Sequence, residues 1–297
     1  MNGQPSHDRS RDLAVILAGG AGTRLQEFSY TVSGDRRPKQ FSTFFGGKSL
    51  LAHTRERISP LFDEENTLFA LTRAHEIHYQ RQLTELAADR KLVQPLNRGT
   101  APAIALSVLE ILHRESDATV AFFPSDHHYL DPTVFRATVS RGLILAKEFP
   151  DRILIVGAPA TYPEVEYGWI QPGLVAVDSP QNPLHFVSAF WEKPSLPQAR
   201  SLQQAGCLWN TFVTIGSASA FVELFARAAP RLLQIMGSGF FEDRLERVYQ
   251  EIEPMDFSRD VLALVPHRLL VLRDGASGWT DFGSPQRALD VLHALAC

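Results

Sequence analysis

The chain has 297 residues, of which 44% are hydrophobic and 21% are charged, and its formal net charge is −4. These values are ordinary for a globular protein, and the slightly acidic balance gives no basis for a general nucleic-acid surface. No stretch approaches the roughly 18 consecutive apolar residues that span a bilayer. The two cysteines, Cys207 and Cys297, share no close spacing, so neither a disulfide framework nor a zinc site is indicated. We therefore expect a cytoplasmic protein that binds neither nucleic acid nor a membrane.

Short apolar runs alternate with helical patterns over the first 160 residues. The polar start, residues 1–11, predicts a disordered lead-in. Apolar runs that are typical of strands buried on both faces are Leu13–Ala18, Thr67–Thr72, Lys91–Gln94, Ala118–Phe123 and Ile153–Gly157. Helical patterns cover Ala101–His113 and Thr133–Phe149, the second after an N-cap candidate, Asp131, and Pro132. This alternation predicts an open, mostly parallel α/β sheet with right-handed crossovers.

After about residue 160, prolines separate shorter segments. Gly168–Gln171 and Phe186–Trp191 predict antiparallel strands that are added to the sheet and form a second lobe over its carboxyl edge. The remaining elements are expected as helices at Ala218–Ala228, Phe240–Ile252 and Ser284–Leu295 and as strands at Leu262–Val265 and Leu269–Leu272. We therefore expect one α/β domain over residues 12–297.

A glycine-rich loop that contains Gly19, Gly20 and Gly22 directly follows the first predicted strand. Glycines let the backbone approach phosphate oxygens and point N–H groups at them. The carboxyl end of a strand is also where open α/β sheets bind ligands. The loop lacks the Lys-Ser/Thr of a P-loop and the third glycine of a dinucleotide fingerprint. A conformational turn without a ligand is the alternative.

Two cations accompany this loop, Arg24 and Lys39. Arginine can hold phosphate oxygens bidentately, and lysine acts as a point charge on a different oxygen. Pro38 stiffens the approach to Lys39. The pair suits a triphosphate whose α-phosphorus is attacked, and the alternative is that both are solvated surface charges.

Two aspartates are candidates for a metal site. Phosphoryl chemistry uses a divalent cation to neutralise charge, and Mg²⁺ is usually held by one or two carboxylates with phosphate oxygens and water. Asp126 follows the strand Ala118–Phe123, and Asp281 lies between a tryptophan and a glycine. A turn or cap is the alternative for each. We expect His127 and His128 either to be packing residues or to support neighbouring residues of the site, because a phosphate nucleophile is already ionised and requires no general base.

These motifs together resemble those of the sugar nucleotidylyltransferases. The glycine loop with Thr23, Arg24 and Leu25, followed by Arg37-Pro38-Lys39-Gln40-Phe41, resembles the family signature. The Pro-Lys-Gln-Phe form is most similar to the mannose-1-phosphate guanylyltransferase branch. The segments around Asp126 and Asp281 resemble the family's Pro-Ala-Asp-His and Trp-Ser-Asp-Leu-Gly, whose aspartates hold the catalytic metal. The resemblance extends from about Leu13 to Leu295.

The resemblance implies a role for each segment. The nucleotide would be bound by the glycine loop and by the segment after the third predicted strand, through Leu17, Ala18, Gly19, Gly20, Gly22, Thr23, Gln94, Asn97, Gly99 and Thr100. Arg24 and Lys39 would stabilise the pentavalent phosphorus, and Asp126 and Asp281 would hold Mg²⁺. Gln94 replaces the acid that is usual in the family, which leaves the choice of base open. A strand-to-helix turn with Thr100 as the N-cap is the structural alternative, and it is compatible with this role.

The sugar phosphate would be held by residues of the second half. Three segments resemble the family's sugar-binding elements, and they imply Tyr167, Gly168, Glu192, Lys193 and Asn210 as ligands of the sugar phosphate. Phe212 stands where the family has glycine, which predicts a reshaped pocket wall.

The expected protein is a Rossmann-like, GT-A-like nucleotidyltransferase with a nucleotide-binding part at about 12–160 and an inserted sugar-binding part at about 161–297. The expected reaction is attack of a sugar 1-phosphate on a nucleoside triphosphate, with GTP and mannose 1-phosphate as the best match. Another sugar or base (a heptose phosphate, UTP, dTTP or CTP) and a non-catalytic regulator that binds nucleotide sugars are the alternatives. The oligomeric state stays open, with a homodimer as one option.

Overall fold

The computed structural model describes residues 12–22, 26–34, 36–180, 182–238 and 244–296. The lead-in expected at residues 1–11 therefore lies outside the described residues. Nine strands form the main sheet, in the order β3-β2-β1-β4-β9-β6-β10-β8-β7. Their bounds are β1 Asp12–Leu17, β2 Thr67–Thr72, β3 Lys91–Gln94, β4 Thr119–Pro124, β6 Ile153–Pro159, β7 Gly168–Val177, β8 Leu184–Glu192, β9 Leu208–Ser217 and β10 Leu269–Arg273.

The strand directions confirm the predicted mixed, mostly parallel sheet. β1 pairs in parallel with β2 and β4, β2 with β3, and β6 with β10. β9 runs antiparallel to β4, β6 and β7, and β8 runs antiparallel to β10 and β7. All strands of this sheet except β8 and β9 therefore point in one direction. The strands predicted near residues 168 and 186 are added to this sheet as β7 and β8.

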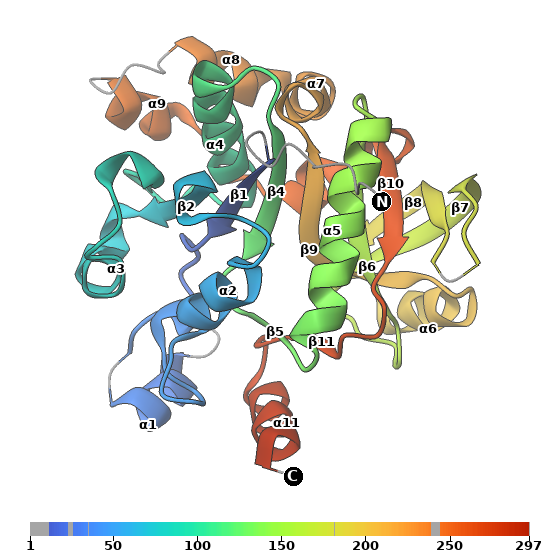
Figure 1. Cartoon of the computed structure of the whole chain (residues 1–297), viewed down its shortest axis with the longest axis horizontal. Coiled ribbons are helices and arrows are strands. Elements are labelled where there is room, and N and C mark those ends of the chain that lie inside the picture. Colours follow the sequence, from blue (N-terminus) through green and yellow to red (C-terminus); the bar gives the residue numbers. More distant parts are fainter. Residues whose placement is uncertain (1–11, 23–25, 35, 181, 239–243, 297) are drawn as a thin grey trace, which may run out of the picture.

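Helices cover both faces of the sheet (Figure 1). The helices are α1 Gln26–Ser33, α2 Leu50–Ile58, α3 Glu76–Gln82, α4 Thr100–Arg114, α5 Pro132–Glu148, α6 Leu196–Gln204, α7 Ala218–Ala228, α8 Pro230–Ser238, α9 Leu245–Glu251, α10 Phe257–Asp260 and α11 Pro285–Ala296. Short 3₁₀ helices lie at Lys39–Phe41, Glu64–Asn66, Arg73–His75, Ala88–Arg90, Leu262–Leu264 and Pro266–Arg268. None of the helices in the described part of the chain is long and apolar enough to cross a membrane.

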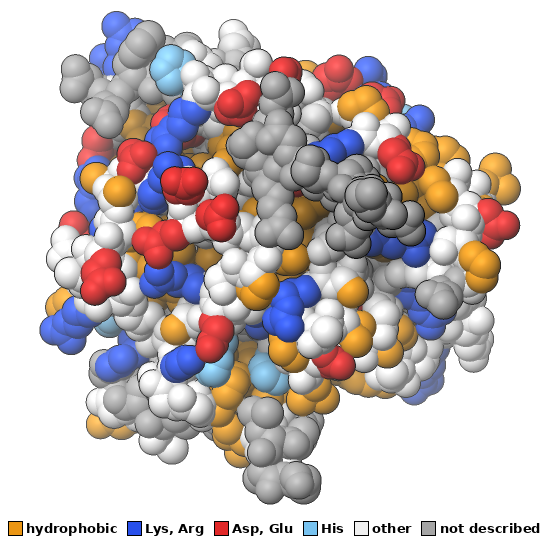
Figure 2. Space-filling view, in the orientation of Figure 1, with side chains coloured by type: hydrophobic (Ala, Val, Ile, Leu, Met, Phe, Trp, Pro, Cys, Tyr) orange, Lys and Arg blue, Asp and Glu red, His pale blue; other side chains and the backbone are white. Residues whose placement is uncertain are grey.

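Two hydrophobic cores lie on opposite faces of the sheet. Along β1, Ala14 and Ile16 pack into one core with α2 and α5, whereas Val15 packs into the other with α4 and α7. Successive side chains of a strand point to opposite faces, so both faces of β1 must be apolar. This explains the uninterrupted apolar run on which the strand prediction rests. On the surface, acidic and basic side chains are interspersed over the face shown in Figure 2.

A second, two-stranded sheet joins distant parts of the chain. β5 (His127–Tyr129) and β11 (Trp279–Asp281) pair antiparallel, with Asp281 opposite His127. β5 begins three residues after the end of β4, at the carboxyl edge of the main sheet. The pairing therefore brings Asp281 next to the residue that follows Asp126.

Two sequence predictions of secondary structure were wrong. The segment predicted as a strand at Leu262–Val265 is a 3₁₀ helix over Leu262–Leu264. A short buried apolar run fits either structure, and Leu262 is fully buried here. Strand β9 was not predicted at all, although it occupies the centre of the sheet, because buried polar residues interrupt its apolar pattern. The helix predicted at Phe240–Ile252 is described from Leu245 onward, and residues 240–243 lie outside the described residues.

Candidate active site

A cavity of about 450 Å³ lies at the carboxyl ends of β1, β3 and β4, beside the N-terminus of α4. Most of the predicted nucleotide-binding residues line it, namely Leu17, Gly19, Gly20, Gln94, Asn97, Gly99 and Thr100. Ala18 is fully buried, and its amide donates a hydrogen bond to Ala70 O. The carboxyl ends of parallel strands and helix N-termini are favoured places for anionic ligands, so the cavity has the location expected of a phosphate site.

Gln40 holds the glycine loop from behind. This side chain is buried, and its Nε2 donates hydrogen bonds to Ala18 O at 3.0 Å and to Gly20 O at 2.7 Å. One amide group therefore satisfies two carbonyls of the loop and fixes their direction. The role of Gln40 in the sequence motif is thus to shape the loop that follows β1.

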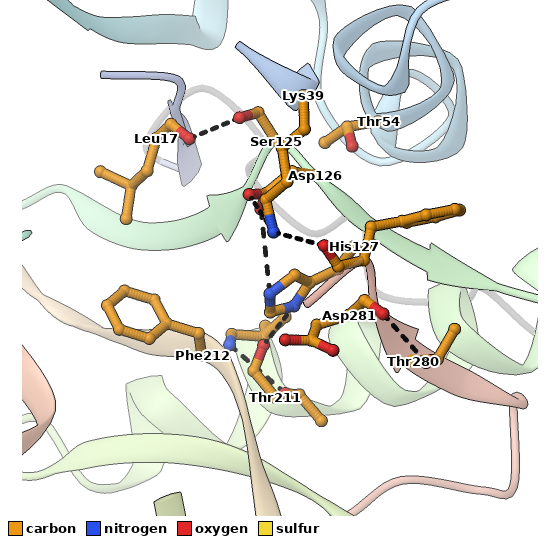
Figure 3. Close-up of polar contacts among 12 residues, drawn as sticks. Leu17, Lys39, Thr54, Ser125, Asp126, His127, Thr211, Phe212, Thr280 and Asp281 are labelled. Atoms are coloured by element: carbon orange, nitrogen blue, oxygen red, sulfur yellow. Dashed lines mark hydrogen bonds and ion pairs between the residues drawn. The ribbon is translucent and has the colours of Figure 1, made fainter. Parts of the chain in front are cut away.

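Other side chains engage the neighbouring carbonyls of the loop. Gly19 O accepts from Thr72 Oγ1 at 3.0 Å and from Asn97 Nδ2 at 3.2 Å. Leu17 O accepts from Ser125 Oγ at 2.7 Å (Figure 3). The amides of Gly19 and Gly20 have no hydrogen-bond partner among the described residues. Loop amides of this kind can donate to phosphate oxygens.

We expect Gln40→Ala to raise the KM for the nucleotide by roughly tenfold, because two loop carbonyls lose a buried side-chain donor and the loop loses its shape. Steady-state kinetics with the triphosphate varied would measure this. Gln80→Ala is the matched control, since Gln80 makes an exposed contact with Glu76. An unchanged KM in Gln40→Ala would show that the loop does not depend on this clamp.

Gly22 allows the loop to pack on the Lys39 backbone. Its φ is +61°, and a Cβ atom at this position would lie 2.9 Å from Lys39 N. Only glycine adopts such a conformation without cost, so Gly22 joins the loop and the cationic segment in space. The predicted nucleotide-binding residue Thr23 and the predicted catalytic residue Arg24 lie outside the described residues.

Lys39 lies beside both aspartates. Its Nζ is 3.0 Å from Asp126 Oδ2 and donates to Phe282 O at 3.1 Å. Burial alone would raise the pKa of Asp126, but Lys39 and His127 outweigh it and lower this pKa below its ordinary value. The pKa of Asp281 is lowered in the same way, by Lys39, His127 and Arg287 against the effect of burial. Both carboxylates are therefore ionised at neutral pH.

The two carboxylates interact with each other across the edge of the site. The charge of Asp281 acts on Asp126 and opposes its ionisation, as expected of like charges held close together. Figure 3 shows Asp126, from the turn between β4 and β5, near His127 of β5 and Asp281 of β11. No cluster of three or more His, Cys, Asp or Glu side chains suited to a metal was found in the described ranges. A Mg²⁺ ion could use these two carboxylates only if substrate oxygens and water completed its shell.

Arg287 is part of this site, and the sequence did not point to it. Its Nη1 is 2.6 Å from Asp281 Oδ1, it forms a second ion pair with Glu164, and its guanidinium lies 4.5 Å from the centre of the Tyr167 ring. Tyr167 OH also donates to Asp281 Oδ1, at 2.8 Å. Arg287 belongs to α11, where nothing in the helical pattern distinguishes it from a surface arginine. These contacts orient Asp281.

His127 and His128 are both largely buried. Burial lowers the pKa of each ring, and that of His128 falls to about 4. The Nδ1 atom of His127 lies 3.2 Å from Thr211 O and 3.2 Å from Trp279 Nε1. A neutral ring can make only one of these hydrogen bonds at a time, because Nδ1 donates to the carbonyl and accepts from the indole. His128 packs edge-on against Phe45.

A smaller cavity of about 110 Å³ adjoins the large one. Four of the predicted sugar-phosphate residues line it, namely Tyr167, Gly168, Glu192 and Asn210, together with Asp281. A Cβ atom on Gly168 would lie 2.8 Å from Glu192 Oε2, so glycine is required for Glu192 to keep its position. Lys193 lines neither cavity: its side chain is exposed, and its backbone N donates to Tyr167 O.

The segment between α9 and α10 contributes to the lining of the large cavity. Gly99 has a φ of +91° and lies against Met255 O, which would be only 2.4 Å from a Cβ atom. Gly99, not Thr100, occupies the N-cap of α4, so the N-cap alternative for Thr100 was wrong. The Thr100 hydroxyl instead accepts from Phe257 N at 2.8 Å. Met255 lines the cavity with its neighbours, and no sequence motif indicated it.

Gln94 is buried and lines the large cavity. Its Nε2 donates to Leu71 O at 3.1 Å, and its Oε1 accepts from Tyr249 OH at 3.3 Å. The amide is therefore held from two sides and presents no negative charge. A base in this cavity would meet a neutral, fixed group at this position.

The chain is similar to known proteins along nearly its whole length. The family model described as nucleotidyl transferase matches residues 13–296. The xanthan biosynthesis protein XanB of Xanthomonas campestris is 27% identical over 288 residues, which cover 94% of this chain and 59% of XanB. A mannose-1-phosphate guanylyltransferase of Klebsiella pneumoniae is 30% identical over 227 residues, 75% of this chain and 46% of that protein. The chain thus spans about half the length of these curated relatives.

A solved structure shares the fold along most of the chain. A Thermus thermophilus protein described as a mannose-1-phosphate geranyltransferase is 31% identical, with a TM-score of 0.80. The match covers 92% of this chain and 76% of that one. A UDP-glucose pyrophosphorylase solved with UDP-glucose matches with 15% identity and a TM-score of 0.58, which shows a likeness of fold alone.

Proposed function

Because the chain belongs to the nucleotidyl transferase family, we propose that it transfers a nucleoside monophosphate from a triphosphate to a sugar 1-phosphate, with release of pyrophosphate. One observation carries this proposal. The large cavity beside the glycine loop and the small cavity at Glu192 and Asn210 share three lining residues, His127, Phe212 and Asp256. A nucleotide in the first and a sugar phosphate in the second would therefore meet beside Asp126 and Asp281.

The chemistry requires positioning and charge neutralisation more than acid–base catalysis. An oxygen of the sugar phosphate would attack the α-phosphorus in line and expel pyrophosphate. The loop amides, Lys39 and Arg24 would stabilise the charge on the reacting phosphate. Asp126 and Asp281 would hold Mg²⁺, which supplies further neutralisation of charge on the phosphates. Glu192 and Asn210, which line the small cavity, would position the sugar phosphate together with Lys193.

Lys39 must change partners when the triphosphate binds. In the structure its ammonium group is engaged by Asp126 and Phe282 O. A triphosphate carries several negative charges, whereas Asp126 carries one and Phe282 O none, so it would attract the lysine toward the glycine loop, on which its backbone already packs. Such an exchange would free Asp126 to act as a metal ligand.

GTP and mannose 1-phosphate are the proposed substrates, and GDP-mannose is the proposed product. The name of the Klebsiella pneumoniae relative supports this pair. The neutral Gln94 and the bulky Phe212 favour a second candidate, in which the same chemistry acts on another base or sugar. The candidates differ in substrate and share the site.

A substrate panel tests the proposal. The protein with Mg²⁺ would be incubated with GTP, UTP, dTTP, CTP or ATP and with mannose, glucose or heptose 1-phosphate, while pyrophosphate is measured. We expect release that requires both substrates and is fastest for GTP with mannose 1-phosphate. A different fastest pair would replace the proposed substrates. Tight nucleotide binding without pyrophosphate release for any pair would instead indicate a non-catalytic regulator.

A further inference from the structure

Phe212 has a backbone conformation that is unusual for its side chain. Its φ is +66°, in the left-handed region that costs energy for every residue with a Cβ atom and little for glycine. It lies in a bulge of β9, where Ile155 pairs with Thr214 and Gly157 pairs with Asn210. Three residues of β9 therefore stand opposite one residue of β6. Strained residues that persist in a fold often serve a function.

Hydrogen bonds hold this conformation on both sides. Phe212 N donates to Asn210 Oδ1 at 3.0 Å, and Phe212 O accepts from Thr214 Oγ1 at 3.1 Å. Asn210 is itself anchored, because its Nδ2 donates to Ser258 Oγ at 3.2 Å. The bulge is thus a built feature of β9, and it fixes the direction in which the Phe212 side chain points.

The Phe212 side chain stands between the two cavities. Of the three residues that line both, His127 and Asp256 are polar, and Phe212 alone is apolar. Its ring centre is 6.2 Å from that of Phe257, which is fully buried, so the two rings lie close together. Phe212 lines the small cavity together with Gly168 and Glu192. A glycine here would contribute no side chain to this lining.

We propose that Phe212 determines which sugar 1-phosphates the small cavity accepts. This inference rests on the proposed function. In a cavity of about 110 Å³, a phenylalanine ring takes space that a glycine would leave open, so we expect the cavity to favour hexose 1-phosphates whose ring carries hydroxyl groups only. An acylamino group, as in an N-acetylhexosamine 1-phosphate, would collide with the ring. Exclusion by a fixed bulky group is a recognised means of specificity.

The test compares Phe212→Gly and Phe212→Ala with the wild-type protein. Each receives an equimolar mixture of glucose 1-phosphate and N-acetylglucosamine 1-phosphate, or of the corresponding manno sugars, with the triphosphate that the panel selects. Mass spectrometry of the sugar nucleotides gives the product ratio. We expect the acetylated share to rise by at least about tenfold in both variants, because both remove the ring.

Comparing the two variants separates the effect of removing the ring from the effect of relieving the backbone conformation. Alanine keeps the cost of the positive φ and glycine removes it, so a rise in the glycine variant alone would overturn the role of the ring. A ratio within twofold of wild type in folded variants would also overturn it. Thermal unfolding would show whether the glycine and alanine variants fold. If either does not, Phe212→Leu would be tested in its place, because leucine keeps part of the packing against Phe257.

Failure of the proposed function would give a different result. If the wild-type protein forms no sugar nucleotide from any pair, the proposed function is refuted. The effect of Phe212 on sugar-phosphate binding would then be measured directly. Thermal unfolding would then be followed with N-acetylglucosamine 1-phosphate present. A larger rise of the midpoint in the glycine and alanine variants than in wild type supports the role of the ring, and equal rises overturn it.

Discussion

Replacing Asp126 or Asp281 by asparagine should lower turnover by about 10³-fold or more, because a metal ion contributes several kcal/mol of transition-state stabilisation that depends on its ligands. Asparagine has nearly the same size, and its oxygen can still accept the hydrogen bonds that Asp281 receives from Tyr167 and Arg287. The fold should therefore persist. Initial rates at saturating substrates and thermal unfolding curves would measure both effects.

A matched control is Asp178→Asn, which removes the same charge from an exposed position after β7. This variant should keep wild-type turnover. Full activity in Asp126→Asn or Asp281→Asn would show that the metal site lies elsewhere. Raising the Mg²⁺ concentration gives a second readout, since weakened metal binding should shift the metal requirement of the asparagine variants upward and leave that of the control unchanged.

Replacing Lys39 by methionine should lower kcat/KM by about 10²- to 10³-fold, the size of effect found when one fixed donor to a developing charge is removed. Methionine keeps much of the apolar stem, and only the ammonium group is lost. That group is the cation nearest to Asp126 in the described part of the chain, and it also acts on Asp281. Kinetics with both substrates varied in turn would measure the loss.

Two further variants show whether the loss is specific to the ammonium group of Lys39. Lys48→Met removes a lysine that pairs with Glu56 on the surface, and it should have little effect, because exposed ion pairs contribute little to stability. Lys39→Arg keeps the charge but places a planar group where a compact ammonium lies between Asp126 and Phe282 O. It should recover only part of the activity. Wild-type kcat/KM in Lys39→Met would contradict a role for Lys39 at the phosphate.

The first half of the site could be predicted from the sequence because its geometry is local. Each of the motifs at Gly19 and Asp126 directly follows an apolar run, and neighbouring parallel strands place their carboxyl ends together. The pairing of β1 with β4 aligns the ends of the two strands, with Leu17 opposite Pro124, so the glycine loop and Asp126 line the same cavity. No long-range information beyond the order of strands was needed for this step.

The second half depends on contacts that no local pattern encodes. Asp281 reaches the site through the pairing of β11 with β5, which are far apart in the sequence, and only the family resemblance indicated it. Arg287 and Met255 have no motif of their own. Strand β9 was missed because Asn210, Thr211 and Thr214 are polar, yet each is buried and hydrogen-bonded. Buried polar groups with partners are tolerated in a core, so hydropathy alone cannot exclude a strand.

The positive φ of Phe212 is another feature that the local sequence pattern does not predict. A sequence in which phenylalanine follows Asn210 and Thr211 gives no sign of a left-handed residue, since bulky side chains rarely adopt that conformation. The substitution relative to the family pattern indicated a changed pocket wall. The bulge and its hydrogen bonds explain how the chain accommodates the ring.

Phosphorus NMR of the reaction mixture tests the central claim most directly. With Mg²⁺, GTP and mannose 1-phosphate, or the best pair from the panel, the signals of both substrates should decline together. The paired doublets of a sugar nucleotide and the signal of pyrophosphate should grow in equal amounts. Release of inorganic phosphate or pyrophosphate at the same rate without the sugar phosphate, and without any sugar nucleotide, would contradict nucleotidyl transfer at this site.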